Sequence, residues 1–276
     1  MTMAIMKKLA VTSLATAIAC TSLIGCASST DTGAIGVKRS QLMVVSNEQV
    51  LQLSNQSFQG TLQAARSKGL LDTDAAQLAR LKRIANRLVT QVSVYRADAA
   101  KWNWEVHSIK SNELNAYVLP GGKIMFYSGI IDRLQLSDDE IAAIMGHEMS
   151  HALREHARER MSQQVATQTG IGIAASVFGL SSGQAQLAGL AGDVGVNLPN
   201  SRTQESEADM MGVELMARAG YNPSAAITLW RKMQAVEGRG EPPQFLSTHP
   251  VSSNRIANIQ ALLPKVMPLY QQAKAR

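Results

Sequence analysis

Residues 137–160 read SDDEIAAIMGHEMSHALREHARER, and this stretch carries the strongest helix signal of the 276-residue chain. Ser137 is a natural N-cap, and Glu140 three residues later completes a capping box. Acidic residues also begin the first turn, from Asp138 on, where the helix dipole favours negative charge. The sequence therefore predicts one helix that begins at Asp138 and ends near Arg160.

The middle of this helix contains His147-Glu148-Met149-Ser150-His151. Histidines four residues apart lie on one helix face, so both imidazoles can bind a single Zn²⁺. Glu148 can then take a proton from a zinc-activated water and pass it to the leaving amine. This pattern is typical of metallopeptidases, and we expect one zinc per chain. The alternative is a helix surface that carries two histidines and a glutamate by chance.

A catalytic zinc needs a third protein ligand and one open position. His156 would lie opposite His147 on a continuous helix, so we do not expect it to bind the metal and interpret it as a surface residue or as a group that supports a ligand from behind. Glu205 is the better candidate, because it shares a helix face with Asp209 one turn later. One of these carboxylates can bind zinc while the other accepts the second ring N–H of a ligating histidine. Glu207 is a rival ligand, although it points to another side of that helix.

The rest of the chain predicts a mainly helical α+β fold with a small β-sheet beside the motif helix. Apolar residues at three- and four-residue steps over 46–92 indicate two helices separated at Lys68-Gly69. Alternating residues and the turn Pro120-Gly121-Gly122 indicate three strands. We expect these strands at 102–109, 116–119 and 123–127, further helices at 201–220 and 223–236, and a pair of helices over 253–274.

Residues 170–198 are rich in Gly, Ala and Ser. Their apolar run at 171–180 spans about ten residues, whereas a membrane-spanning helix needs roughly 20. We therefore expect a mobile or loosely helical flap.

The first 25 residues predict a signal peptide, with Lys7 and Lys8 ahead of an apolar run. The run ends in Leu23-Ile24-Gly25-Cys26, which resembles the lipobox of bacterial lipoproteins. That resemblance implies cleavage before Cys26 and lipidation of its thiol. An uncleaved anchor or a plain secretory signal is the alternative. Residues 26–45 are small and polar, and they predict a tether.

The composition narrows the class of partner. Lys and Arg number 27 against 21 Asp and Glu, and the sequence pI is near 9.4. Such a surplus favours anionic lipid surfaces or is simply a solvated surface with extra basic residues. No basic patch is interleaved with aromatic residues, so we do not expect nucleic-acid binding.

Several motifs together resemble the HtpX-like and CAAX-prenyl-protease-like family of zinc peptidases. They are the His147–His151 segment, Glu205-x-x-x-Asp209, Ser247-Thr248-His249-Pro250 with Arg255, and Asn115-Ala116-Tyr117 with Pro120-Gly121-Gly122. The likeness covers roughly residues 40–265 and points to the soluble periplasmic lipoprotein branch, which is BepA/LoiP-like. It implies a gluzincin-type domain with His147, His151 and Glu205 as ligands, Glu148 as general base and Asp209 behind a ligand.

The chain also departs from some members of this family. The membrane helices of the embedded members are not expected here, so a prenyl-peptide substrate is disfavoured. A tetratricopeptide-like repeat after His249, which would dock partners, is not expected either.

His249 has three interpretations. It can stabilise the oxyanion of the tetrahedral intermediate, or it can bind zinc as a fourth ligand and hold the enzyme latent, which the resemblance suggests and we favour. It can also be an ordinary loop histidine.

The strand at Asn115, Ala116 and Tyr117 has two interpretations. It is either an edge to which an extended substrate adds or a core strand of a hairpin.

These features predict a zinc endopeptidase that cleaves misfolded or mis-assembled envelope proteins. We expect it on the periplasmic side of the outer membrane, anchored by a lipid at Cys26, with protein or peptide substrates and with the outer-membrane assembly machinery as a candidate partner. The alternative is an assembly factor or holdase with structural zinc, but such a site would have no use for Glu148. The expected boundaries are a signal peptide at 1–25, a tether at 26–45, a peptidase domain at 46–265 and a helix end at 266–276.

Overall fold

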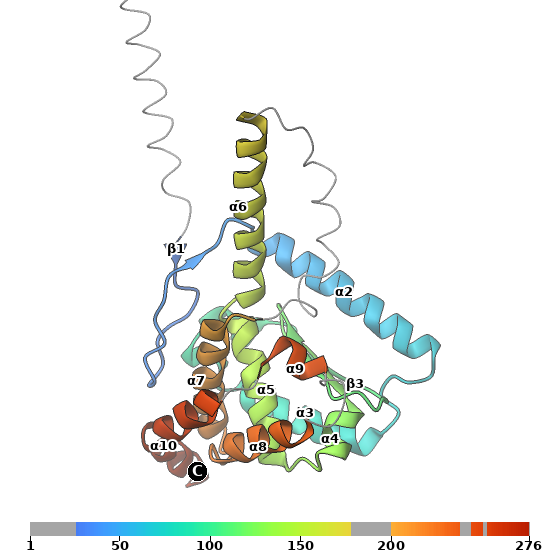
Figure 1. Ribbon diagram of the computed structural model, residues 1–276. Helices are drawn as coiled ribbons and strands as arrows, with labels where there is room; N and C mark the ends of the chain where they lie inside the picture. The colour runs from blue at the N-terminus through green and yellow to red at the C-terminus, as the bar shows by residue number, and fades with distance from the viewer. Residues whose placement is uncertain (1–25, 178–199, 238–243, 251–252, 276) are drawn as a thin grey trace, which may run out of the picture.

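The computed structural model describes residues 26–177, 200–237, 244–250 and 253–275. The expected signal peptide lies outside the described residues, as does most of the expected flap. The described part is mainly helical and contains one three-stranded sheet (Figure 1), which confirms the predicted α+β class. None of its helices combines the length and the apolar character that a membrane crossing requires.

The helices occur largely where the sequence predicts them. They are α2 (Asn47–Ser67), α3 (Ala75–Val89), α4 (Ser128–Arg133), α5 (Asp138–Leu153), α6 (His156–Val177), α7 (Arg202–Arg218), α8 (Ala225–Glu237), α9 (Gln244–Thr248) and α10 (Ser253–Lys274). The helix pair predicted for 253–274 is wrong, since α10 is a single helix that contains two prolines. It continues through them because its buried residues Ile259, Leu262 and Val266 form one stripe, and this stripe packs on the core.

The sheet has the order β3-β5-β4, with β4 at its edge. Strands β3 (Glu105–Ile109) and β5 (Lys123–Tyr127) are parallel, whereas β4 (Ala116–Leu119) runs antiparallel to β5. Alternate side chains point to opposite faces. One face contacts α2 through Tyr117 and Met125, and the other joins the main core through Val118 and Ile124. Helix α5 packs beside β4, so the edge strand lies next to the His147–His151 segment.

The predicted single helix from Asp138 to Arg160 is wrong. Helix α5 ends at Leu153, Glu155 adopts the left-handed conformation with φ 54°, and α6 begins at His156. The Arg154 carbonyl has left the helical pattern and accepts hydrogen bonds from Ser29 and Gln41. The interruption is therefore held by contacts with the N-terminal segment, and it changes the direction in which His156 points.

Helices α5 and α7 cross closely at Gly146 and Gly212. A Cβ built at Gly212 would lie 2.7 Å from the His147 backbone nitrogen, and one at Gly146 would lie 3.0 Å from the Gly212 carbonyl oxygen. The missing side chains let the two backbones approach directly beside His147. This contact sets the distance between the motif on α5 and the carboxylates on α7.

Gly212→Ala is therefore expected to destabilise the protein by about 1–3 kcal/mol, the usual cost of overpacking a core. Gly60→Ala is the control, because Gly60 lies in α2 with open space around its Cα. That change should stabilise the protein by about 0.5–1 kcal/mol. Urea denaturation of both variants checks the pair, and equal effects would contradict the close-crossing role of Gly212.

Residues 26–45, for which the sequence predicts a tether, include a segment that lies against the domain. Strand β1 (Cys26–Ala27) pairs with β2 (Gln41–Leu42), and Ile35 and Val37 are buried in the core. The buried Glu214 carboxylate on α7 accepts the backbone N–H groups of Ala34 and Ile35. This N-terminal segment thus joins the helices that carry the candidate site.

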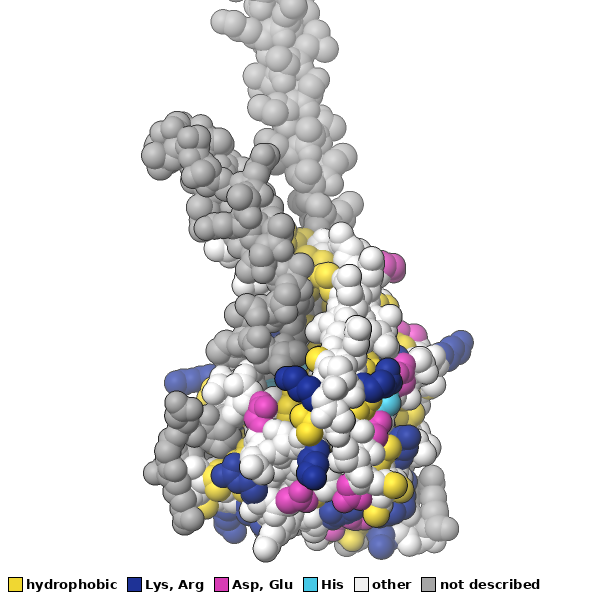
Figure 2. All heavy atoms as spheres, turned by 90° about the vertical axis from the view of Figure 1, so that its right-hand side faces the viewer, with side chains coloured by type: hydrophobic (Ala, Val, Ile, Leu, Met, Phe, Trp, Pro, Cys, Tyr) yellow, Lys and Arg dark blue, Asp and Glu magenta, His cyan; other side chains and the backbone are white. Residues whose placement is uncertain are grey.

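Basic and acidic side chains are intermixed on the face seen in Figure 2, and neither sign forms a continuous field there. On this face, the surplus of Lys and Arg is spread over the surface.

Candidate active site

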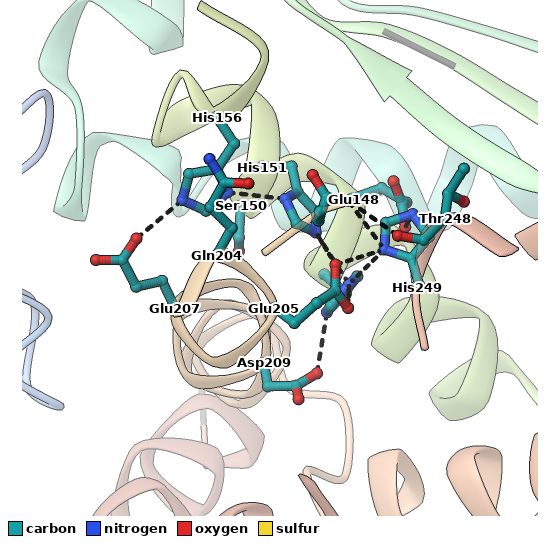
Figure 3. Close-up of polar contacts among 12 residues, drawn as sticks. Glu148, Ser150, His151, His156, Gln204, Glu205, Glu207, Asp209, Thr248 and His249 are labelled. Atoms are coloured by element: carbon teal, nitrogen blue, oxygen red, sulfur yellow. Dashed lines mark hydrogen bonds and ion pairs between the residues drawn. The ribbon is translucent and has the colours of Figure 1, made fainter. Parts of the chain in front are cut away.

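Three segments bring the candidate site together. Helix α5 supplies His147, Glu148 and His151, α7 supplies Glu205, and the residue after α9 is His249. Figure 3 shows the Glu148, His151, Glu205 and His249 side chains pointing toward one another. Each of the five is at most 8% exposed. Such a concentration of buried ionisable groups is costly unless they pair or bind a metal.

The donor atoms of four residues are spaced as zinc requires. His147, His151, Glu205 and His249 each offer one ligand atom, and these atoms lie within 4.8 Å of one another. His147 Nε2 is 3.1 Å from His151 Nε2, 3.5 Å from Glu205 Oε2 and 3.3 Å from His249 Nδ1. Ligands about 2.0–2.1 Å from a tetrahedral zinc lie roughly 3.3–3.4 Å apart. The residues therefore fit one zinc ion, with His249 at the fourth position.

Glu148 lies in the same cluster but makes a different set of contacts. Its Oε1 is 3.4 Å from His249 Nε2 and has no hydrogen-bond partner among the described residues. Burial raises the pKa of the Glu148 carboxyl. A buried carboxylate with a free oxygen and a raised pKa is well suited to accept a proton from a water molecule.

Asp209 and Arg255 support the ligands from behind. Asp209 Oδ1 lies 3.0 Å from His147 Nδ1, the ring nitrogen that faces away from the cluster. Arg255 donates to both Asp209 oxygens at 2.7 Å, and its Nη1 lies 2.7 Å from Glu205 Oε2. Burial raises the pKa of Asp209, but Arg255 outweighs it and holds the pKa below its usual value. An ionised Asp209 fixes the tautomer of His147 with Nε2 free for the metal.

Of the two roles expected for His156, the surface role is wrong, and the support of a ligand from behind agrees with its contacts. Because α6 starts a new helix, His156 is fully buried, and its Nδ1 lies 2.8 Å from His151 Nδ1. Its Nε2 lies 3.0 Å from Glu207 Oε2. Glu207, the rival ligand, thus contacts this histidine (Figure 3). Burial raises the pKa of Glu207, but hydrogen bonds from His156 and Arg39 outweigh it and lower the pKa to about 2.

A cavity separates strand β4 from the cluster. It is lined by Asn115, Ala116 and Tyr117 on one side and by Glu148 and His249 on the other. Of the described strands, only β5 pairs with β4, so the second edge of β4 is not part of the sheet. An extended peptide bound there would pass beside Glu148.

Sequence reasoning missed three residues of this site. Trp230 of α8 lies under the Arg255 guanidinium, whose Cζ is 3.7 Å from the centroid of the tryptophan ring, and Trp230 also meets the His147 ring edge-on. Arg160 and Asn200 line the cavity and hydrogen-bond to each other. A lone tryptophan in a helix carries no chemical signal, and the other two residues lie outside every recognised motif.

Removing one ligand should empty the metal site. We expect about one zinc per purified parent chain and much less zinc in His147→Ala or His151→Ala. Each change leaves only one histidine and Glu205 of the three ligands that a catalytic zinc requires, since His249 stands at the position that such a site keeps open. Elemental analysis after dialysis measures the content, and His107→Ala, a histidine on β3 paired with Asp72, is the control. Full occupancy in His147→Ala would contradict the assignment of this ligand.

The chain is similar in sequence to known metallopeptidases. A model described as peptidase family M48 matches residues 75–263. The mitochondrial metalloendopeptidase OMA1 of Schizosaccharomyces pombe is 39% identical over 163 residues, or 59% of this chain and 47% of that protein. Metalloprotease LoiP of Escherichia coli is 31% identical over 245 residues, or 87% of this chain and 91% of that protein.

The beta-barrel assembly-enhancing protease of Escherichia coli is 27% identical over 188 residues, or 65% of this chain and 38% of that protein. The chain spans about half the length of the OMA1 proteins that it matches.

Proposed function

The chain belongs to peptidase family M48 and is a metallopeptidase with a site for one zinc ion, and we propose that it is an endopeptidase of the bacterial cell envelope. Its substrates in this proposal are misfolded or mis-assembled envelope proteins. The observation that carries the proposed chemistry is the placement of Glu148 beside the four donor atoms and facing the β4 cavity.

The chain's own residues account for the steps of peptide hydrolysis. Zinc, when bound, lowers the pKa of water and polarises the scissile carbonyl. Glu148 accepts the proton of the attacking water and returns it to the leaving amine. Strand β4 and the preceding Asn115 line the cavity, and the unpaired edge of β4 offers backbone groups to an extended substrate, which requires little side-chain specificity. A site of this kind accepts many unfolded sequences.

The envelope location rests on two observations. The Leu23-Ile24-Gly25-Cys26 stretch resembles a lipobox, so the proposal places the mature protein on the periplasmic side of the outer membrane with a lipid on Cys26. The match to LoiP, a metalloprotease of a bacterium, covers most of both chains and supports a bacterial setting for the protein. OMA1 is mitochondrial by name, so membership of the family alone does not fix the compartment.

The name of a second relative suggests a candidate partner. The beta-barrel assembly-enhancing protease of Escherichia coli is named for the assembly of β-barrels. We include the outer-membrane assembly machinery as a partner in the proposal, since unassembled barrels would supply unfolded substrates there. This partner belongs to the proposal and not to the family assignment.

Two measurements test the proposal. The set of proteins that accumulates in cells carrying Glu148→Gln should be enriched in unassembled envelope proteins compared with wild type. An enrichment of cytoplasmic proteins instead would contradict the proposed substrates. Labelled palmitate should enter the wild-type protein but not Cys26→Ala, and equal labelling of both would contradict lipidation at Cys26.

A further inference from the structure

A continuous set of hydrogen bonds leads from the buried His151, a candidate zinc ligand, to the partly exposed Arg39 of the N-terminal segment. His151 Nδ1 meets His156 Nδ1 at 2.8 Å, and His156 Nε2 meets Glu207 Oε2 at 3.0 Å. Glu207 in turn accepts from Arg39 Nε at 3.0 Å and Nη2 at 2.9 Å, and from Arg154 Nη2 at 3.2 Å. Both histidines and Glu207 are at most 8% exposed.

Only one arrangement of protons satisfies these contacts with both rings neutral. A His151 that offers the lone pair of Nε2 to a metal carries its proton on Nδ1 and donates it to His156 Nδ1. His156 must then carry its own proton on Nε2, where it donates to the Glu207 carboxylate. Glu207 therefore selects the tautomer of His156, and His156 selects the tautomer of His151.

We propose that His156, Glu207 and Arg39 are positioning residues that hold His151 in its metal-binding orientation and tautomer, so that the N-terminal segment is part of the active site. Ligating histidines in proteins generally donate their other N–H to a fixed acceptor. His147 has Asp209 in this role. For His151, the acceptor is the neutral ring of His156, which in turn donates to the Glu207 carboxylate.

Arg39 completes this arrangement from outside the helices. Its guanidinium pairs with both Glu207 and Glu159, which lie on α7 and α6. The Arg39 carbonyl oxygen also accepts from Arg154 Nη2 at 2.7 Å. The segment is tied to α7 at a second place, where Glu214 binds the backbone of Ala34 and Ile35. Docking of the segment thus keeps Glu207 oriented toward His156.

Zinc affinity tests the proposal without any protein substrate. Zinc affinity depends on the metal site and not on the proposed envelope function, so the positioning proposal and the proposed function can fail separately. Competition with a chromophoric chelator should show zinc binding weakened about 10–100-fold in His156→Ala. His156→Asn keeps an acceptor near the position of Nδ1 and should recover part of the loss. Glu207→Gln and Arg39→Ala should each weaken binding to a smaller extent.

The thermal midpoint of each variant without metal shows whether the variant is still folded. A variant that keeps the parent's midpoint and binds zinc more weakly has lost the positioning of a ligand and not its fold. Arg83→Ala, which removes an exposed ion pair with Asp138, is the matched control for Arg39→Ala and should bind zinc like the parent. Arg39 is partly exposed, so its variant remains testable even where His156→Ala fails to fold. Parent-like zinc affinity in both Glu207→Gln and Arg39→Ala, or no recovery in a folded His156→Asn, would overturn the proposal.

Discussion

Glu148→Gln is expected to lower the rate of peptide hydrolysis by about 10²–10⁴-fold, the contribution of a positioned general base. The substitution keeps the shape of the side chain and removes its capacity to accept a proton. Glu148 is 3% exposed and lies beside the donor atoms without being one of the four candidate ligands. The zinc content should therefore remain that of the parent.

Cleavage of an unfolded protein such as casein measures the rate, and elemental analysis measures the zinc. Glu48→Gln, on the exposed side of α2, is the control for the same chemical change. Burial raises the pKa of the Glu148 carboxyl, which makes its carboxylate a better proton acceptor. The side-chain amide that replaces this carboxylate in the variant cannot take this role. Parent-like proteolysis in Glu148→Gln would contradict its role as general base, whereas the absence of cleavage by both the parent and the variant would favour a holdase with structural zinc.

The parts of the site that could be predicted are those with a local signal. The capping box at Ser137 and Glu140 forms as predicted and fixes the start of α5. The spacing of His147 and His151 places both rings on one face without further information. Glu205 and Asp209 share a face for the same reason. Each of these inferences depends on residues within a few turns of one helix.

The parts that could not be predicted depend on contacts between distant segments. Nothing near Leu153 resembles a helix stop, since neither Gly nor Pro occurs there. The helix ends because Ser29 and Gln41 bind the Arg154 carbonyl, more than a hundred residues away in sequence. The position of His156 follows from that ending. The close crossing at Gly146 and Gly212 is likewise visible only once α5 and α7 are packed.

His249→Ala separates the two chemical roles of that residue by several orders of magnitude. His249 Nδ1 lies 2.9 Å from Glu205 Oε1 and 3.3 Å from His147 Nε2, as a fourth tetrahedral ligand would. This position is the one that a catalytic site keeps open for water or substrate. The geometry therefore favours latency, and we expect the substitution to raise activity.

The size of the increase depends on how often the parent site is open. A minor conformation in a protein is typically populated at roughly 0.1–10%, so full opening would raise activity by about 10–10³-fold. A residue that stabilises the oxyanion would instead lower activity by about 10²–10³-fold when removed. Casein cleavage and self-cleavage of His249→Ala distinguish the two outcomes, with His107→Ala as the control. Because His147, His151 and Glu205 remain, zinc is expected to stay bound, so a loss of activity at full zinc content would reject latency and identify His249 as a catalytic donor.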